Sequence, residues 1–364
     1  MSRGSLRRGT GACGKPSSRA SKRFRASRKS PHNDNLRLVK NGARDTEERC
    51  SRARSATTRL YNREQFSFIL RHSSLECDSL NAHMPHQQGQ GPAQQGPQPL
   101  PGVDAIIAVG SGKGGVGKTT LSVNLAVALV KMGHKVGLLD ADVYGPNVPL
   151  MLGVNDQPRM VGENRIEPLQ AYGLKVISVG FLNPGDKPII WRGPMLHQII
   201  RQFLGLVEWG QLDYLIVDLP PGTGDIALSL VQTVPLTGAV VVSTPSDVSL
   251  QDARKAVEMF RQMKVDIVGV VENMSYFTCP HCQHEVDIFS RGGAEKMAHK
   301  FNVPFLGNIA LDPEVRKSGD GGTPVVLEGE NSPHAKSIYE FARNVVTRTT
   351  EIRANAPASV IQIQ

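Results

Sequence analysis

The feature that most restricts the fold of this chain is a series of short, continuously apolar runs that begins at residue 105. The runs lie at 105–109, 136–139, 174–179, 214–217, 238–242, 267–271 and 304–309. Between them the sequence predicts helices near 119–132, 195–208, 225–233, 249–263, 291–300 and 333–349. Apolar strands that alternate with helices are typical of a mostly parallel sheet buried on both faces. We therefore predict a doubly wound α/β domain, whose ligands bind beyond the carboxyl ends of the strands.

The first apolar run leads directly into a glycine-rich segment, GSGKGGVGKTT at 110–120, and then into the helical LSVNLAVALVKMG. Gly112, Gly117, Lys118 and Thr119 satisfy the P-loop pattern G-x-x-x-x-G-K-[ST] in its required strand–loop–helix context. Backbone N–H groups of such a loop, and the positive end of the helix, bind phosphate oxygens. Lys118 is predicted to reach the β- and γ-phosphates of ATP, and the Thr119 hydroxyl to bind Mg²⁺. The predicted nucleotide-binding residues are Gly112, Lys113, Gly114, Gly115, Val116, Gly117, Lys118, Thr119 and Thr120.

Acidic residues follow two other apolar runs, as DAD at 140–142 and DLPPGTGD at 218–225. An aspartate at the end of a strand beside a P-loop can hold the water shell of Mg²⁺ or orient the attacking water. Gly222 and Gly224 would allow the second segment to move with the γ-phosphate. Asp142 and Asp218 are therefore candidate catalytic residues, together with Lys118.

A pair of cysteines, Cys279 and Cys282, forms a CxxC motif within TCPHCQH. The motif alone is a weak signal and leaves three functional interpretations open. A redox dithiol needs a helix N-terminus on a thioredoxin-like fold, whereas this pair is followed by the strand-like EVDIF. A Zn²⁺ site completed by His281 or His284 would lack a fourth ligand within one chain. In a dimer, two CxxC pairs would supply four thiolates to one [4Fe–4S] cluster.

The loop GKGGVGKTT contains a second lysine, Lys113, and resembles the loop of the dimeric ATPases of the MinD/ParA/nitrogenase iron-protein class. The resemblance implies that Lys113 acts in catalysis by crossing a dimer interface to the partner's nucleotide. It further implies that Asp142 orients the attacking water and that Asp218 lies beside Mg²⁺. Asn273, just beyond the run 267–271, matches the position from which this class recognises adenine, with a turn residue as the alternative.

Longer blocks carry a closer resemblance, among them DADVYGPNVPLMLG, WGQLDYLIVDLPPGTGD, ENMSYFTCPHC and DIFSRGGAEKMA. Over about residues 103–350 they are similar to the Mrp/NBP35/ApbC family of iron–sulfur cluster carrier ATPases. The resemblance implies a homodimer that binds ATP and Mg²⁺ and hydrolyses ATP slowly. It also implies a [4Fe–4S] cluster held by Cys279 and Cys282 of each chain, and its transfer from the assembly machinery to apo-proteins. It does not assign a role to Trp191-Arg192-Gly193-Pro194.

Basic charge is concentrated in one part of the chain. The 364 residues carry a net charge of +9, which by itself suggests a nucleic-acid or anionic-membrane partner. Residues 1–100, however, hold 19 Lys and Arg against 7 Asp and Glu, whereas the remainder holds 23 against 26. The predicted organisation is a disordered basic extension at 1–84, a Gln/Gly/Pro linker at 85–102, an ATPase domain at 103–350 with a cluster loop at 278–289, and a tail at 351–364. Neither nucleic acid nor a membrane is a predicted partner.

Two other classes of function stay open at this stage. One is a positioning ATPase that binds membrane or DNA through the basic extension or through an amphipathic helix at 335–352. The other is an ATPase chaperone stapled by zinc. The Arg/Ser-rich leader also fits a transit peptide for the mitochondrial matrix. Its shortage of apolar residues favours the cytoplasm instead.

Overall fold

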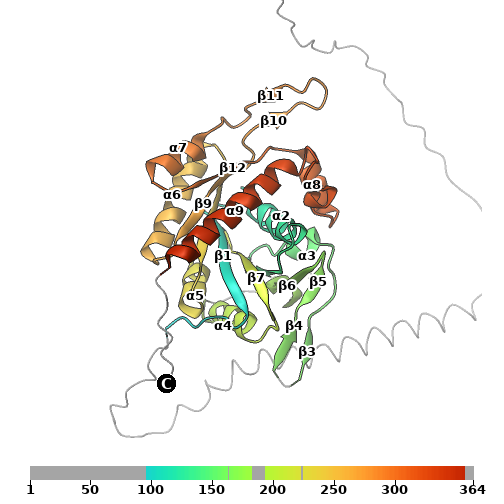
Figure 1. Ribbon diagram of the computed structural model, residues 1–364, viewed down its shortest axis with the longest axis vertical. Helices are drawn as coiled ribbons and strands as arrows, with labels where there is room; N and C mark the ends of the chain where they lie inside the picture. Colours follow the sequence, from blue (N-terminus) through green and yellow to red (C-terminus); the bar gives the residue numbers. More distant parts are fainter. Residues whose placement is uncertain (1–95, 163, 183–192, 223, 357–364) are drawn as a thin grey trace, which may run out of the picture. The chain divides into compact units, whose positions relative to one another are not determined.

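A computed structural model describes residues 96–162, 164–182, 193–222 and 224–356 of the chain. The predicted extension at 1–84, most of the linker, and residues Trp191 and Arg192 lie outside the described residues. The described part contains an eight-stranded sheet in the order β12–β9–β8–β1–β7–β2–β6–β5 (Figure 1). Every neighbouring pair is parallel except β5 and β6. The predicted doubly wound, mostly parallel α/β fold is confirmed.

Each predicted apolar run forms a strand of this sheet. The strands are β1 (Val103–Ser111), β2 (Val136–Asp140), β6 (Leu174–Ser178), β7 (Leu212–Asp218), β8 (Gly238–Ser243), β9 (Ile267–Glu272) and β12 (Phe305–Asn308). The antiparallel edge strand and two separate ribbons were not among the predicted runs: β5 (Leu169–Ala171), β3 (Arg159–Val161) with β4 (Arg165–Glu167), and β10 (Phe277–Thr278) with β11 (Glu285–Val286). Strand β11 lies within the strand-like EVDIF at 285–289. The other short strands have only two or three residues, too few for an apolar pattern to be recognised.

Helices cover both faces of the sheet. Those that match predicted helices are α2 (Lys118–Lys131), α4 (Gly193–Gly205), α5 (Asp225–Thr233), α6 (Asp247–Gln262), α7 (Gly293–Lys300) and α9 (Lys336–Asn355). The short α3 (Val148–Met151) and α8 (Pro313–Asp320) are additional. Helices α2 and α9 pack together on one face, and α4 to α7 lie on the other (Figure 1). No described helix is long and apolar enough to cross a bilayer.

Helix α9 continues past the predicted domain boundary at residue 350 and ends at Asn355. Val345 and Thr349 are buried, and Ile352 packs against the core. Because these residues are spaced three and four apart, they share one face of the helix and hold its last turns against the domain. The predicted tail at 351–364 therefore begins as helix.

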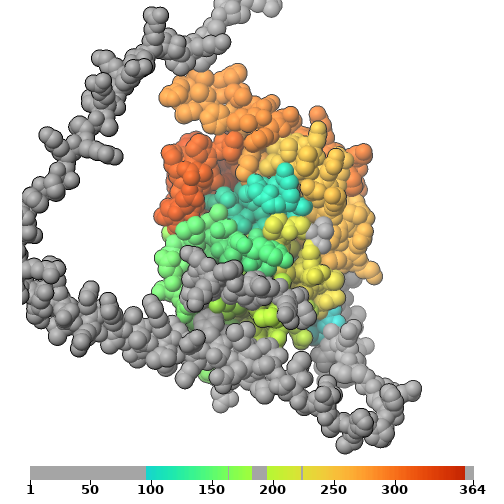
Figure 2. Space-filling view, turned by 180° about the vertical axis from the view of Figure 1, so that it is seen from behind, coloured from blue at the N-terminus to red at the C-terminus, as the bar shows by residue number. Residues whose placement is uncertain are grey.

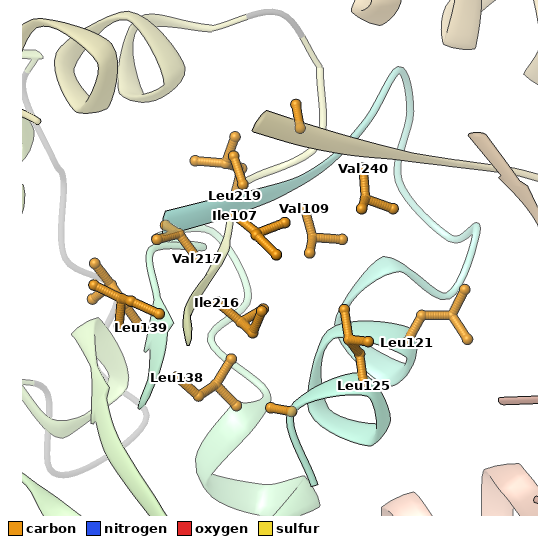
Figure 3. Packing of buried hydrophobic residues seen from close by; sticks show 14 of the residues in the cluster. Ile107, Val109, Leu121, Leu125, Leu138, Leu139, Ile216, Val217, Leu219 and Val240 are labelled. Carbon is orange, nitrogen blue, oxygen red and sulfur yellow. The ribbon is translucent and has the colours of Figure 1, made fainter. Parts of the chain in front are cut away.

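The core lies between the central strands and α2. Ile107 of β1, Leu138 of β2 and Ile216 of β7 are fully buried, and Leu121 and Leu125 of α2 pack toward them (Figure 3). Such close packing on both sides leaves a strand and its following helix little freedom to shift. The segment that joins β1 to α2, at 112–117, is consequently held at both ends by the core.

Parallel register brings polar residues from distant parts of the chain to one edge of the sheet. Asp140 of β2 lies opposite Asp218 of β7. Ser243 of β8 lies opposite Glu272 of β9 in the same way. These four residues end their strands, so the carboxyl edge of an otherwise apolar sheet is lined with polar groups, as expected for a ligand-binding edge.

The side chain of Asp140 joins the end of β2 to β6 and to the segment that follows β2. Its fully buried carboxyl group accepts hydrogen bonds from Ser178 Oγ of β6, at 2.8 Å, and from the backbone N–H of Asp142, at 3.1 Å. Burial, together with the negative charge of Asp218 on the neighbouring strand, raises the pKa of Asp140 to about 8.

The raised pKa of Asp140 predicts how stability depends on pH. Between about pH 4 and pH 8 the folded chain keeps a proton that the unfolded chain releases, so the free energy of unfolding falls as pH rises. We expect Asp140→Asn to remove the contribution of Asp140 to this decrease in the free energy of unfolding, which is on the order of a few kcal/mol. Urea denaturation at pH 5 and pH 8 measures it, with exposed Asp156→Asn as the control. An unchanged fall in the Asp140 variant would contradict the prediction.

Candidate functional site

The glycine-rich segment forms a tight loop between β1 and the first turn of α2. Gly115 and Gly117 both have φ of 79°, a left-handed conformation that favours glycine. A Cβ atom added at Gly117 would also lie 2.2 Å from Nδ2 of Asn273. One added at Gly112 would lie 2.1 Å from the backbone of Asp252. Helix α2 then begins at Lys118, so the loop leads its backbone to a helix N-terminus, as the P-loop pattern predicts.

The side chains of four predicted site residues meet beyond this loop. Nζ of Lys118 lies 2.8 Å from Oδ2 of Asp218 and 3.6 Å from Oδ2 of Asp142. The Thr119 hydroxyl donates a 2.7 Å hydrogen bond to the same Asp218 oxygen. The ammonium group thus lies between two carboxylates, one at the end of β7 and one two residues beyond the end of β2.

Electrostatics at the site follow from this arrangement. Burial raises the pKa of Asp142, the positive charge of Lys118 opposes that rise, and the negative charge of Asp218 adds to it. Two backbone N–H groups, those of Tyr144 and Gly145, donate to Oδ1 of Asp142 and orient its carboxylate.

Ser122 is a site residue that the sequence patterns did not identify. Its hydroxyl donates a 2.6 Å hydrogen bond to Oδ1 of Asp218, and the residue is fully buried. Ser122 lies four residues after Lys118, which places both on one face of α2. Helical spacing from the P-loop lysine indicates only the shared face, because the partner of Ser122 lies 96 positions away in the chain.

The oxygen atoms at the site fit Mg²⁺. Magnesium prefers hard oxygen ligands and often takes one or two from the protein. The Thr119 hydroxyl and the Asp218 carboxylate are in direct contact at the end of the phosphate loop, so they offer such ligands beside the predicted phosphates. Thr119 and Asp218 are therefore the residues that would hold the cation.

Lys113 and Asn273 border the phosphate loop. Lys113 is half-buried, and its carbonyl accepts a 3.0 Å hydrogen bond from the Ser111 hydroxyl. Nδ2 of the buried Asn273 donates to the carbonyl of Val116 at 2.8 Å, and its backbone N–H donates to Ser243. The structure thus brings Asn273 to the loop from the end of β9. The roles of Lys113 at a second chain and of Asn273 toward adenine stay predictions.

The CxxC pair lies at the tip of the β10–β11 hairpin, which stands away from the body of the domain (Figures 1 and 2). The backbone N–H of Cys279 donates to the carbonyl of His284 at 3.0 Å, and that of Gln283 donates to Cys279 at 2.9 Å. Cys279 is half-buried and Cys282 is exposed. Both thiols are accordingly presented to the outside of the domain.

The turn favours the thiolate form of Cys279. Backbone N–H groups of Cys282 and His281 and the thiol of Cys282 donate to the Cys279 sulfur and lower its pKa. The thiolate is the form of cysteine that binds metals. Among the described residues, no group of three His, Cys, Asp or Glu side chains is arranged to hold a metal ion. Neither His281 nor His284 is therefore part of such a group with the two thiols.

Known proteins resemble the chain over most of its length. It is 50% identical over 258 residues to an iron-sulfur cluster carrier protein of Aquifex aeolicus, covering 70% of this chain and 71% of the relative. It is 47% identical over 266 residues to an Arabidopsis thaliana protein named "Iron-sulfur protein required for NADH dehydrogenase, mitochondrial", covering 73% of this chain and 85% of the relative.

A solved structure shares both fold and sequence. It is a nucleotide-binding protein from Archaeoglobus fulgidus in complex with ADP, which matches with a TM-score of 0.55 and 41% identity over 61% of this chain and 88% of that one. Similarity to a nucleotide-binding protein agrees with a loop whose backbone leads to a helix N-terminus, as a phosphate-binding loop does.

The family described as "ParA: NUBPL iron-transfer P-loop NTPase" matches residues 102–346. This range extends from β1 into α9 and includes both the phosphate loop and the CxxC hairpin. The resemblance predicted from the sequence blocks is confirmed. The chain belongs to the ParA family, as an iron-transfer P-loop NTPase of the NUBPL type.

Proposed function

We propose that the protein hydrolyses ATP and carries a [4Fe–4S] cluster, which a homodimer binds between its subunits and transfers to apo-proteins. The observation that supports this most is the combination of a phosphate loop and an exposed, thiolate-favouring CxxC turn on one domain. The names of the relatives, which are iron–sulfur proteins, and the ADP in the related structure agree with it.

ATP would bind along the loop from Gly112 to Thr120. The Lys118 ammonium would then exchange part of its contact with Asp218 for the β- and γ-phosphate oxygens, whose charge it offsets. Bound Mg²⁺ supplies positive charge to the phosphates, and Thr119 and Asp218 would hold it. Asp142, whose pKa is raised by burial, is suited to accept a hydrogen bond from the attacking water and to orient it. Lys113 would reach the nucleotide of the partner subunit.

The cluster is cargo, so its site must both hold and release it. One hairpin offers two thiols, and a [4Fe–4S] cluster takes four cysteine thiolates. Two subunits related by a two-fold axis would supply them. Because Cys282 is exposed at the hairpin tip, a recipient protein could reach the cluster directly.

ATP hydrolysis is predicted to require Lys118. We expect Lys118→Met to lower the hydrolysis rate by about 100-fold or more, because a positioned charge on the phosphates is lost. Phosphate release measures the rate. Lys131→Met, an exposed lysine at the other end of α2, is the matched control and should behave as wild type. Circular dichroism checks folding, since Asp218 loses its counter-charge. Equal hydrolysis by a folded Lys118 variant would refute the assignment.

Cluster binding is predicted to require both cysteines of the hairpin. After anaerobic reconstitution with iron and sulfide, wild type should hold about two iron atoms per chain, and Cys279→Ser/Cys282→Ser should hold close to none. Iron and acid-labile sulfide analysis measures this. Cys50→Ser/Cys77→Ser, which removes two thiols outside the motif, should match wild type. The carrier proposal fails if the two double variants hold equal amounts, and stoichiometric zinc without sulfide would favour the zinc-stapled alternative.

A positioning ATPase is distinguished by its binding partner. The carrier proposal expects no ATP-dependent sedimentation of the full chain with anionic liposomes or with duplex DNA. Sedimentation that requires ATP, and that Lys118→Met abolishes, would favour the positioning ATPase instead.

The compartment remains a proposal as well. The sequence prediction is the cytoplasm, with the mitochondrial matrix as the alternative if residues 1–84 are a transit peptide. The name of the Arabidopsis relative supports the mitochondrial alternative.

A further inference from the structure

Glu272, the last residue of β9, is a fully buried carboxylate that takes no part in the proposed hydrolysis or cluster binding. Oε1 accepts hydrogen bonds from the Ser275 hydroxyl, at 2.6 Å, and from the backbone N–H of Gly292, at 2.9 Å. Oε2 accepts one from the backbone N–H of Ala294 at 2.7 Å. A buried carboxylate is tolerated only when hydrogen bonds replace its water, and the N-terminus of α7 adds a favourable dipole.

The donors to Glu272 lie on both sides of the CxxC hairpin. Ser275 comes directly before Tyr276, and Gly292 directly follows Arg291. One carboxylate therefore closes the base of the segment 276–291. A second contact joins the same two ends, because the Arg291 guanidinium lies 4.3 Å from the centre of the Tyr276 ring. The base of the hairpin is thus held, whereas its tip with the two thiols is free of the domain body (Figure 1).

Two adjacent glycines allow α7 to approach Glu272. Gly292 has a φ of 80°, in the left-handed region. A Cβ added at Gly293 would lie 2.7 Å from Cδ1 of Leu250 and 2.9 Å from the carbonyl oxygen of Pro245. A larger residue at Gly293 would push the start of α7 away from the carboxylate, and one at Gly292 would be strained by its left-handed backbone.

The residue next to Glu272 contacts the nucleotide site. Asn273 donates from Nδ2 to the carbonyl of Val116 in the phosphate loop, directly before Gly117 and Lys118. Val116 is buried, so it has little room to move independently of Asn273. A rigid planar peptide bond joins Glu272 to Asn273. Glu272 therefore contacts the base of the CxxC hairpin, and its neighbour Asn273 contacts the phosphate loop.

We propose that Glu272 is a positioning residue that couples the nucleotide state of the phosphate loop, through Asn273, to the exposure of the CxxC thiols. When phosphate draws the loop backbone toward itself, a shift of Val116 displaces Asn273, and the hairpin base moves with Glu272. The inference rests on the proposed function, because it assigns the control of the cluster-binding thiols to ATP.

The test uses the full chain without cluster, with its cysteines reduced. The alkylation rates of Cys279 and Cys282 by iodoacetamide are followed by mass spectrometry of their peptide, with and without the ATP analogue AMP-PNP and Mg²⁺ at saturation. We expect the nucleotide to change the wild-type rate by about fivefold or more. Glu272→Gln should bring the ratio of the two alkylation rates close to one, because in either orientation of the amide its nitrogen faces a backbone N–H, that of Gly292 or of Ala294, which it cannot accept. The affinity for AMP-PNP should stay unchanged.

Glu285→Gln is the matched control. It removes a carboxylate from the hairpin itself and its ion pair with Arg291, yet it leaves the contacts of Glu272 intact, so it should respond as wild type does. If Glu272→Gln fails to fold, Ser275→Ala takes its place, because Ser275→Ala removes only one of the three hydrogen bonds to Glu272. In that variant AMP-PNP should change the alkylation rate by a smaller factor than in wild type.

The inference is overturned if wild-type thiols do not respond to AMP-PNP. It is equally overturned if folded Glu272→Gln, or Ser275→Ala in its place, responds as fully as wild type. Iron content after reconstitution, measured on the same preparations, tests the carrier function separately. A chain that holds a cluster through Cys279 and Cys282 but whose thiols ignore the nucleotide would refute the coupling alone.

Discussion

The buried carboxylate of Asp218 joins the sheet, the phosphate loop and the first helix of the domain. It accepts hydrogen bonds from the ammonium group of Lys118 and from the hydroxyls of Thr119 and Ser122. An ionised carboxylate without such partners would be very costly in this interior. Because β7 lies between β1 and β2, in parallel register with both, the position of Asp218 is set by the packing of the sheet. The geometry of the nucleotide site therefore depends on the core.

Glu272 repeats this arrangement at another strand end. Each of the two carboxylates ends a parallel strand, is fully buried and accepts three hydrogen bonds. Asp218 organises the residues that would bind phosphate, whereas Glu272 organises the base of the CxxC hairpin. The sheet supports both regions by combining a packed interior with a polar carboxyl edge.

Much of the fold could be predicted from local patterns. All strands with continuous apolar runs lie within a few residues of their predicted limits, since burial on both faces imposes an unmistakable pattern. The predicted helices are present as well, although α9 extends six residues beyond its predicted end and the short α3 and α8 were not predicted. The short β3, β4, β5 and β10 were not predicted, because two or three residues carry no periodicity, whereas β11 lies within the strand-like EVDIF. Ser122 and Glu272 were missed for a different reason. Ser122 bonds to a residue 96 positions away, and Glu272 bonds to a backbone N–H 20 positions away.

The sequence by itself determined which chemical groups the protein has and their local order: a phosphate loop before a helix, and two thiols separated by two residues. These are local properties, because a loop of nine residues or a four-residue turn specifies its own contacts. Only the tertiary structure decided which carboxylate faces which donor, and that Glu272 and Asn273 lie between the two sites. Such contacts arise from the register of parallel strands and the packing of helices on them, which join segments far apart in the chain.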